Sequence, residues 1–190
     1  MTSMIAPVAP ESEAILDSFY EVVRGQIREK PLMGTWENWI ANVLGRHLDN
    51  FVSQHELGTV ILENLFLLDR VANLQRRPDI AFVSRQRWLG LPAKSNAWEV
   101  VPDLAVEVTS PTNKADEVMA KIEEYFRVGV RRVWVVYCEQ RKVYAYTSPR
   151  HVAILEPADE LGGGDVIPGF RLSLAKLFDE GETVSSPSQP

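Results

Sequence analysis

The chain has 190 residues, of which 45% are hydrophobic and 24% are charged, and its formal net charge is −6. This length is enough for one domain with a sizeable core, and the composition excludes an intrinsically disordered chain. The acidic balance argues against a protein that coats nucleic acid without specificity, because such proteins carry an excess of lysine and arginine.

The cysteine content and the apolar runs limit where the protein acts. A single cysteine, Cys138, excludes an internal disulfide, and its place in an apolar run predicts a small buried side chain. No apolar run approaches the length of a membrane span, and residues 1–10 lack the basic and apolar regions of a signal peptide. We therefore expect a cytoplasmic protein without a membrane partner.

Both ends of the chain are rich in proline, serine and threonine, which is typical of mobile tails. We expect a partly mobile N-terminal segment over residues 1–18 and a flexible C-terminal tail over residues 179–190. No internal repeat or linker interrupts the chain between them. A single domain is therefore predicted over residues 19–178.

The predicted elements begin with a hairpin and a helix. Residues 19–30 contain two short strand-like runs joined at Arg24-Gly25, a plausible hairpin turn. Over residues 35–51, apolar side chains recur at steps of three and four, which predicts a helix.

Apolar and alternating runs predict strands further along the chain, over residues 59–69, 79–83, 103–109, 131–139, 142–148 and 151–156. A helix over residues 114–129 separates two of these strands and ends at a glycine, a usual stop. Strand, helix and strand in this order predict a parallel βαβ unit. A short helix closes the domain. The expected fold class is α/β or α+β, with a mixed central β-sheet flanked by helices.

Two carboxylates stand in these predicted strands. Side chains alternate across a sheet, so Glu107 shares a face with Ala105 and Thr109, while the valines beside it pack on the other face. A carboxylate inside a central strand is costly to bury unless a cation, a metal or hydrogen-bond donors meet it. Asp79 lies at the start of another strand. Two carboxylates that converge from neighbouring strands are a usual way to hold Mg²⁺, which takes oxygen ligands.

The helix over residues 114–129 adds a cationic side chain. Its core face is predicted from helical spacing to hold Val118, Met119, Ile122, Tyr125 and Phe126. Lys121 lies at the border of this face, beside Tyr125, and can lean over the sheet. An ammonium group in that place can stabilise the negative charge that develops on a phosphate.

Five segments in this order resemble the Uma-two family of restriction endonuclease-like proteins, within the PD-(D/E)xK nuclease superfamily. They are "YEVVRGQIREK", "RRPDIAFVS", "PDLAVEVTSP", "KIEEYFRVGVRRVWVV" and "GGDVIPGFRLSLAKLF". The resemblance covers about residues 19 to 178. It implies a restriction endonuclease-like fold and a metal-dependent endonuclease that hydrolyses phosphodiester bonds in DNA with Mg²⁺ or Mn²⁺.

The resemblance also implies roles for particular residues. Asp79 and Glu107 match the two acidic positions of the superfamily pattern, as metal ligands and catalytic residues. The sequence departs from the pattern at Thr109, where a lysine is expected, and the resemblance suggests that the catalytic lysine is Lys121 on the following helix. An acid or histidine is also expected in the first helix region. Glu37 is the candidate for this metal ligand, and Glu21 and Glu29 are weaker ones.

Further side chains are candidates for contact with substrate. Arg76, Arg77 and Tyr125 are possible substrate-contacting residues. The four arginines of this region form either a phosphate-facing patch around Asp79 or a solvated face; they are Arg76, Arg77, Arg85 and Arg87.

Each site residue also has a plainer interpretation. Asp79 alone would be a strand cap or an ion-pair partner of Arg76 or Arg77. Lys121 alone would pair with Glu117 or Glu124 on the surface of its helix.

Two other interpretations of the whole chain remain open. One is a catalytically inactive module with a nuclease fold that binds nucleic acid or a protein partner, which the acidic net charge and the displaced lysine favour. The other adds a homodimer whose paired clefts face one duplex. Its contacts are expected at the sheet edge formed by residues 142–148 and 151–156.

Overall fold

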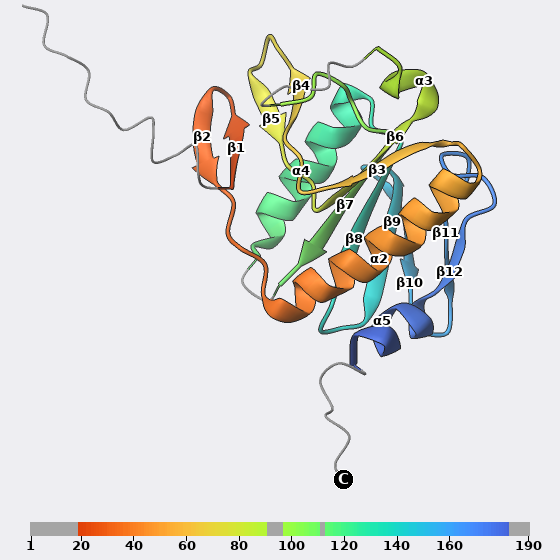
Figure 1. Cartoon of the computed structure of the whole chain (residues 1–190). Coiled ribbons are helices and arrows are strands. Elements are labelled where there is room, and N and C mark those ends of the chain that lie inside the picture. Colours follow the sequence, from red (N-terminus) through yellow and green to blue (C-terminus); the bar gives the residue numbers. More distant parts are fainter. Residues whose placement is uncertain (1–18, 91–96, 111–112, 183–190) are drawn as a thin grey trace, which may run out of the picture.

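The computed structural model describes residues 19–90, 97–110 and 113–182, and its main body is a six-stranded mixed sheet (Figure 1). The strands lie in the order β10-β9-β8-β7-β6-β3. Their bounds are β3 Gly58–Leu62, β6 Ile80–Ser84, β7 Leu104–Thr109, β8 Arg132–Tyr137, β9 Lys142–Ser148 and β10 His151–Leu155. This sheet, flanked by helices, confirms the expected fold class. Residues 179–182 of the tail expected over 179–190 belong to a helix, Leu174–Glu182, whereas residues 183–190 and the expected mobile segment 1–18 lie outside the described residues.

The centre of the sheet is the predicted βαβ unit. Strand β7 is followed by helix α4, Ala115–Val128, and then by β8, which pairs with β7 in parallel. Asp116 and Glu117 stand in the first turn of α4, where carboxylates interact favourably with the helix dipole. The helix stops at Gly129, whose φ of 100° is the left-handed conformation that glycine adopts without a steric cost. The strand–helix–strand prediction is confirmed.

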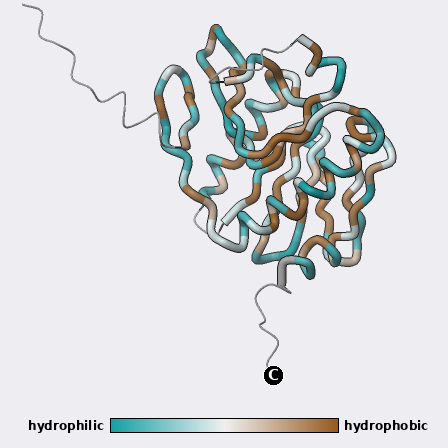
Figure 2. The backbone as a smooth tube through the Cα atoms, in the orientation of Figure 1, coloured by the Kyte–Doolittle hydropathy of each residue, from teal (hydrophilic) through white to brown (hydrophobic). Residues whose placement is uncertain are grey.

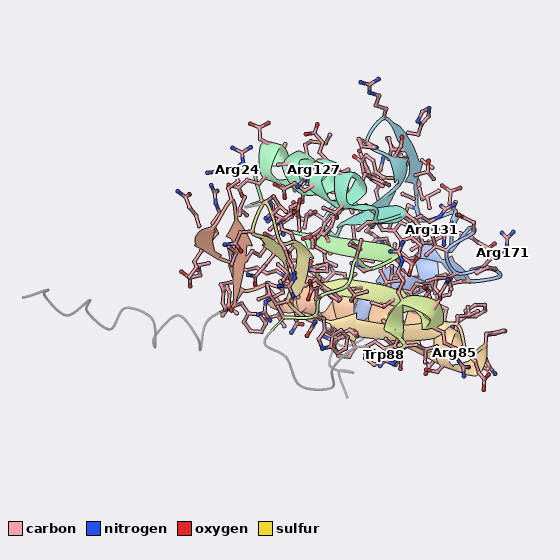
Figure 3. The ribbon with its side chains drawn as sticks, turned by 90° about the horizontal axis from the view of Figure 1, so that it is seen from above. Arg24, Arg85, Trp88, Arg127, Arg131 and Arg171 are labelled. Carbon is pink, nitrogen blue, oxygen red and sulfur yellow. The ribbon has the colours of Figure 1, made fainter. Side chains whose placement is uncertain are left out.

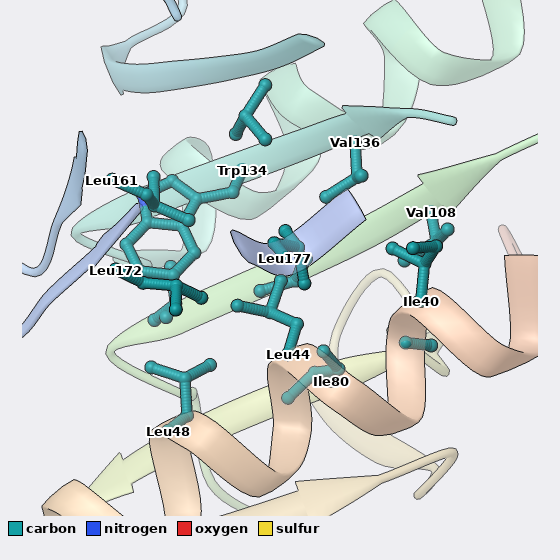
Figure 4. Close-up of a cluster of buried hydrophobic side chains, with 14 of the residues drawn as sticks. Ile40, Leu44, Leu48, Ile80, Val108, Trp134, Val136, Leu161, Leu172 and Leu177 are labelled. Atoms are coloured by element: carbon teal, nitrogen blue, oxygen red, sulfur yellow. The ribbon is translucent and has the colours of Figure 1, made fainter. Parts of the chain in front are cut away.

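Two helices cover one face of the sheet and α4 covers the other (Figure 1). Helix α2, Thr35–Gln54, and helix α5, Leu174–Glu182, pack on the first face. There Leu44 and Leu48 meet side chains from the sheet and from α5, in a cluster that includes Ile80, Val108, Trp134, Val136 and Leu177 (Figure 4). The most hydrophobic stretches of the backbone run through these central strands (Figure 2).

The opposite face forms a second core against α4. Val118, Ile122 and Tyr125 of this helix are buried there against small and branched side chains of the sheet. Met119 was also predicted in this face but is exposed, because the contact with the sheet is narrower than the apolar stripe of the helix.

A smaller antiparallel sheet lies beside the main one, in the order β2-β1-β5-β4. Its strands are β1 Tyr20–Val23, β2 Gln26–Glu29, β4 Phe66–Asp69 and β5 Leu74–Arg76. The predicted hairpin is confirmed, and both turn residues have positive φ, 53° at Arg24 and 76° at Gly25, as a type I′ turn requires.

The single strand expected over residues 59–69 is wrong. The chain turns at Glu63, which has a φ of 52°, so β3 joins the main sheet and β4 joins the small one. Glu63 and Asn64 thus separate two apolar runs. The alternation pattern alone predicts these two runs as one strand.

The remaining elements are short: α3 Arg85–Trp88, β11 Glu160–Gly162 and β12 Arg171–Ser173. The sheet edge expected over residues 142–148 and 151–156 is corrected in part. β9 lies between β8 and β10, so β10 alone forms this edge of the main sheet.

Among the described residues, no helix is long and apolar enough to cross a membrane.

Candidate active site

Asp79 and Glu107 lie near each other at one end of the β6–β7 pair. β6 and β7 are antiparallel with Ile80 paired to Val106, Asp79 immediately precedes β6, and Glu107 follows Val106 on β7. The N–H of Asp79 donates to the Val106 carbonyl at 3.0 Å, which ties Asp79 to the backbone of β7. The two carboxylates are close enough that the charge of Asp79 adds to burial in raising the pKa of Glu107. Both are buried, with Asp79 2% and Glu107 6% exposed.

The carboxylate of Asp79 is held by a lysine that the sequence did not single out. Lys30 Nζ lies 2.5 Å from Oδ1 of Asp79, and the N–H of Val108 donates to Oδ2 at 2.5 Å. The same ammonium group reaches Glu63 Oε2 at 2.8 Å and the carbonyl oxygen of Arg77 at 2.9 Å. The plainer interpretation of Asp79 as a partner of Arg76 or Arg77 is therefore wrong about the partner.

The carboxylate of Glu107 is bound by two side chains of helix α4. Lys121 Nζ lies 2.8 Å from Oε2 of Glu107, and the hydroxyl of Tyr125 donates to Oε1 at 2.6 Å. Lys121 and Tyr125 are four residues apart on α4 and therefore share a helix face. Lys121 also lies 3.2 Å from Oε1 of Glu21. The expectation that Lys121 leans over the sheet is confirmed, and its partners are not the helix neighbours Glu117 and Glu124.

Glu21 and Arg76 extend this network below the surface. Arg76 is buried, and its guanidinium group lies 2.6 Å from Oε2 of Glu21 and 2.5 Å from Oε2 of Glu124. The guanidinium group of Arg76 thus pairs with two carboxylates inside the protein, and its contact with substrate stays a prediction. Tyr125 is likewise fully buried, and its hydroxyl bonds to Glu107, so it can orient this carboxylate.

The other arginines do not gather around Asp79. Arg77 stays near, but its guanidinium group donates to the Glu63 carbonyl at 2.7 Å and lies over the ring of Phe19. Arg85 and Arg87 follow the far end of β6, and a strand of five residues spans about 17 Å. Figure 3 shows Arg85 beside Trp88 of α3, on the opposite side of the molecule from Arg24 in the turn between β1 and β2. The phosphate-facing patch of four arginines is therefore corrected.

Burial and charge set the protonation of the cluster. Burial raises the pKa of Asp79 and of Glu107, and the neighbouring lysines offset only part of this effect. Burial alone would lower the pKa of Lys121, but the charges of Glu107 and Glu21 outweigh it, so that pKa is raised. The pKa of Lys30 is raised for the same reason, through Asp79. Both lysines are therefore positively charged at neutral pH.

Glu37 does not complete a metal-ligand set. It stands in the first turn of α2, on the sheet face opposite α4. Burial, with the charges of Glu37 and Asp79, raises the pKa of Cys138 to about 12, which places both acids near one end of the sheet. Within the described residues, no group of three or more His, Cys, Asp or Glu side chains is placed to hold a metal ion. Glu37 as a third metal ligand therefore stays a prediction.

Thr109 occupies the position where the superfamily pattern carries lysine. It is buried on the face of Glu107, and its hydroxyl donates to the carbonyl oxygen of Val136 at 3.0 Å. A lysine there would have to share this packed space with the side chains of α4. The helix-borne Lys121 brings an ammonium group to Glu107 from above the sheet instead.

A cleft connects this cluster to solvent. It has a volume of about 310 Å³ and is lined by Phe19, Lys30, Pro31, Leu32, Met33, Asn38 and Glu63. Lys30 and Glu63 belong both to the cleft and to the network around Asp79. Access to Asp79 from this side therefore passes Lys30.

Three residues of the cluster were missed or ranked low from sequence. Glu21 was a weaker candidate, and Lys30 and Glu63 were not considered for the site. Glu21 stands inside a short predicted strand, where a carboxylate is uncommon, and in the structure it is buried together with Val22. Lys30 directly follows β2 and Glu63 stands at the turn between β3 and β4, so only the tertiary contacts bring them to Asp79.

Comparisons with known proteins show the family and a structure with a similar fold. Residues 10–175 match the model of the Uma2 family, whose description is "putative restriction endonuclease". A crystal structure of a "putative nuclease belonging to DUF820" from Anabaena variabilis has a similar fold, with a TM-score of 0.76 and 19% sequence identity. The match covers 85% of this chain and 90% of the other. No curated protein matches the sequence.

Proposed function

The chain belongs to the Uma2 family, and we propose that it is a metal-dependent endonuclease that hydrolyses phosphodiester bonds in DNA. One observation carries the proposal: Asp79 is bonded to the backbone of β7 on either side of Glu107, and Lys121 lies 2.8 Å from Glu107. Two acids can hold a divalent cation that activates water, and a lysine beside them can stabilise the charge that develops on a phosphate.

The donor chemistry of the two acids fits Mg²⁺ or Mn²⁺. Both ions prefer oxygen ligands, and Mg²⁺ is commonly bound by one or two carboxylates that leave other positions to water and phosphate. Asp79 and Glu107 would hold the ion. Their burial without a cation is unfavourable, and in the structure each of them contacts an ammonium group. When bound, the ion would lower the pKa of a water molecule and polarise the phosphate.

The protein's own side chains would orient these groups. Tyr125 donates to one oxygen of Glu107 and Lys121 binds the other, so the carboxylate has a single orientation. Lys121 stays protonated because of its acidic neighbours. Its positive charge would stabilise the negative charge that builds up on the phosphate in the transition state.

The direct test is cleavage of supercoiled plasmid with Mg²⁺ or Mn²⁺ by the wild type, Glu107→Gln and Glu117→Gln. Glu117 is a matched control, because it lies on α4 but its side chain is exposed. We expect the wild type and Glu117→Gln to nick the plasmid and Glu107→Gln to lose this activity. Equal cleavage by all three proteins would contradict a site at Glu107.

One feature favours a second candidate, a module that binds nucleic acid or a protein partner without cleaving DNA. Lys30 and Lys121 already neutralise Asp79 and Glu107 within the protein. A site of this kind is stable without a metal. Saturable DNA binding in fluorescence anisotropy, with no cleavage in Mg²⁺ or Mn²⁺, would support this candidate over the nuclease.

We also propose that two copies associate through β10. The strand forms one edge of the main sheet, and its side chains are mostly exposed, including Val152 and Ile154. These two pair with Tyr146 and Tyr144 of β9, so they lie beside aromatic side chains. An edge strand without charged residues is a ready template for pairing with another strand.

A further inference from the structure

Lys30 is a second lysine in the candidate active site, and its ammonium group occupies a cage of oxygen atoms. The three acceptors are Asp79 Oδ1 at 2.5 Å, Glu63 Oε2 at 2.8 Å and the Arg77 carbonyl oxygen at 2.9 Å. An ammonium group has three N–H donors, so this cage satisfies it fully. Two carboxylates and a carbonyl are also the ligand types that a divalent cation takes.

We propose that Lys30 competes with the divalent cation for Asp79 and thereby sets the metal affinity of the site. This inference rests on the proposed function. A metal ion lies about 2.1 Å from a carboxylate oxygen that binds it, whereas Lys30 Nζ is 2.5 Å from Oδ1 of Asp79. The N–H of Val108 already donates to the other oxygen. The ammonium group must therefore leave Asp79 before an ion binds there.

Lys30 has a place to go when it leaves Asp79. The cleft of about 310 Å³ is lined by Lys30 itself and by Glu63. The side chain of Glu63 is more exposed than that of Asp79, and it already binds the same ammonium group. A lysine on its flexible stem can keep Glu63 as a partner while its nitrogen moves toward solvent.

The two lysines therefore have different roles. Lys121 binds Glu107 and Glu21 from α4, and no ion pair joins it to Asp79 within the described residues. Lys30 lies just after β2, at the cleft, and its charge acts chiefly on Asp79. Removal of Lys30 frees a ligand oxygen, whereas removal of Lys121 takes away a charge that the proposed reaction uses.

The test measures Mn²⁺ affinity directly, from the electron paramagnetic resonance signal of free Mn²⁺ in titrations of the full chain. Proteins to compare are the wild type, Lys30→Met, Lys30→Arg and Lys176→Met. Lys176 is a matched control, because its side chain is exposed on α5 and its loss changes the net charge equally. If Lys30 occupies Asp79 nine-tenths of the time, Lys30→Met binds Mn²⁺ about tenfold more tightly than the wild type. Lys30→Arg and Lys176→Met should stay close to the wild type.

The outcomes separate this inference from the proposed function. Addition of Asp79→Asn to Lys30→Met should abolish the gain, which assigns it to the same oxygen. Unchanged Mn²⁺ affinity in Lys30→Met, with Asp79-dependent binding in the wild type, would overturn the role of Lys30 and leave the metal site intact. Absence of Asp79-dependent binding in every variant would overturn both.

A second variant and a second measurement cover a loss of folding. Lys30→Gln also lacks the charge but retains polar atoms that can bond to Glu63. Both neutral variants should have a lower thermal unfolding midpoint than the wild type without metal, because Asp79 and Glu63 lose their cation. Mn²⁺ should raise that midpoint more in these variants than in the wild type. An equal rise in all proteins would contradict the competition.

Discussion

Lys121 and Tyr125 divide the two carboxylate oxygens of Glu107 between them, one turn apart on α4. Lys121 Nζ lies 2.8 Å from Oε2, and the Tyr125 hydroxyl donates to Oε1 at 2.6 Å. Helical spacing alone brings them to the same face, and the parallel βαβ unit brings that face over the strand that carries Glu107.

Replacement Tyr125→Phe should destabilise the protein by about 1–3 kcal/mol, because it leaves one oxygen of a buried carboxylate without a donor. Urea unfolding measures the change. Tyr144→Phe is the control, since this tyrosine is only half-buried and contacts Tyr137 rather than an acid. A loss no larger in Tyr125→Phe than in Tyr144→Phe would show that the hydroxyl contributes nothing to the site.

Replacement Lys121→Met should lower the rate of plasmid nicking by about 10²-fold or more, because the transition state loses a nearby positive charge. Lys121→Arg should retain part of the rate, since it keeps the charge. Lys114→Met should cleave like the wild type, because Lys114 is exposed at the start of α4. Full activity in folded Lys121→Met would remove Lys121 from the mechanism.

The Cys138 thiol should be inert in the folded protein. Burial raises its pKa from the ordinary value of 9.0 to about 12. Between these values the unfolded chain releases a proton that the folded protein keeps, so stability should fall as the pH rises through this window. Urea midpoints across the window should fall less steeply in Cys138→Ala. Rapid alkylation of the native thiol by iodoacetamide at about pH 8.5 would contradict the prediction.

Replacement Leu44→Ala should destabilise the protein by about 2–5 kcal/mol, because it leaves a cavity between α2 and the sheet (Figure 4). Leu44 is fully buried, whereas Leu32 is 82% exposed. Leu32→Ala should therefore change the free energy of unfolding by no more than about 0.5 kcal/mol. Chemical denaturation of the two variants checks the contrast. Similar losses would mean that α2 does not depend on this contact.

Association through β10 predicts a mass of two chains for the wild type in light scattering after size-exclusion chromatography. Ile154→Lys should give a mass of one chain, because a buried unpaired charge opposes the contact. Val71→Lys should leave the dimer intact, since Val71 is fully exposed away from this strand. A monomeric wild type, or a dimeric Ile154→Lys, would refute the proposed interface.

Much of the fold was predictable because its signals are periodic. The amphipathic spacing of α2 and α4 and the apolar runs of β6, β7 and β8 predicted those elements and the parallel unit at their centre. The break at Glu63 was not predictable in this way, because two adjoining apolar runs carry the same pattern whether they form one strand or two.

The candidate site also has one part that local sequence patterns predicted and another that they did not. Alternation within a strand placed Glu107 on one face, and helical spacing placed Lys121 beside Tyr125, so these relationships belong to the sequence itself. The partners were decided by the tertiary structure: Lys30 reaches Asp79 from 49 positions away, Arg76 is drawn inward by Glu21 and Glu124, and Glu37 arrives on the opposite face. Local patterns encode the direction in which a side chain points. The pairing of charges that are distant in the sequence depends on burial, because each buried carboxylate needs a cation or a hydrogen-bond donor. Only the folded chain brings these partners together.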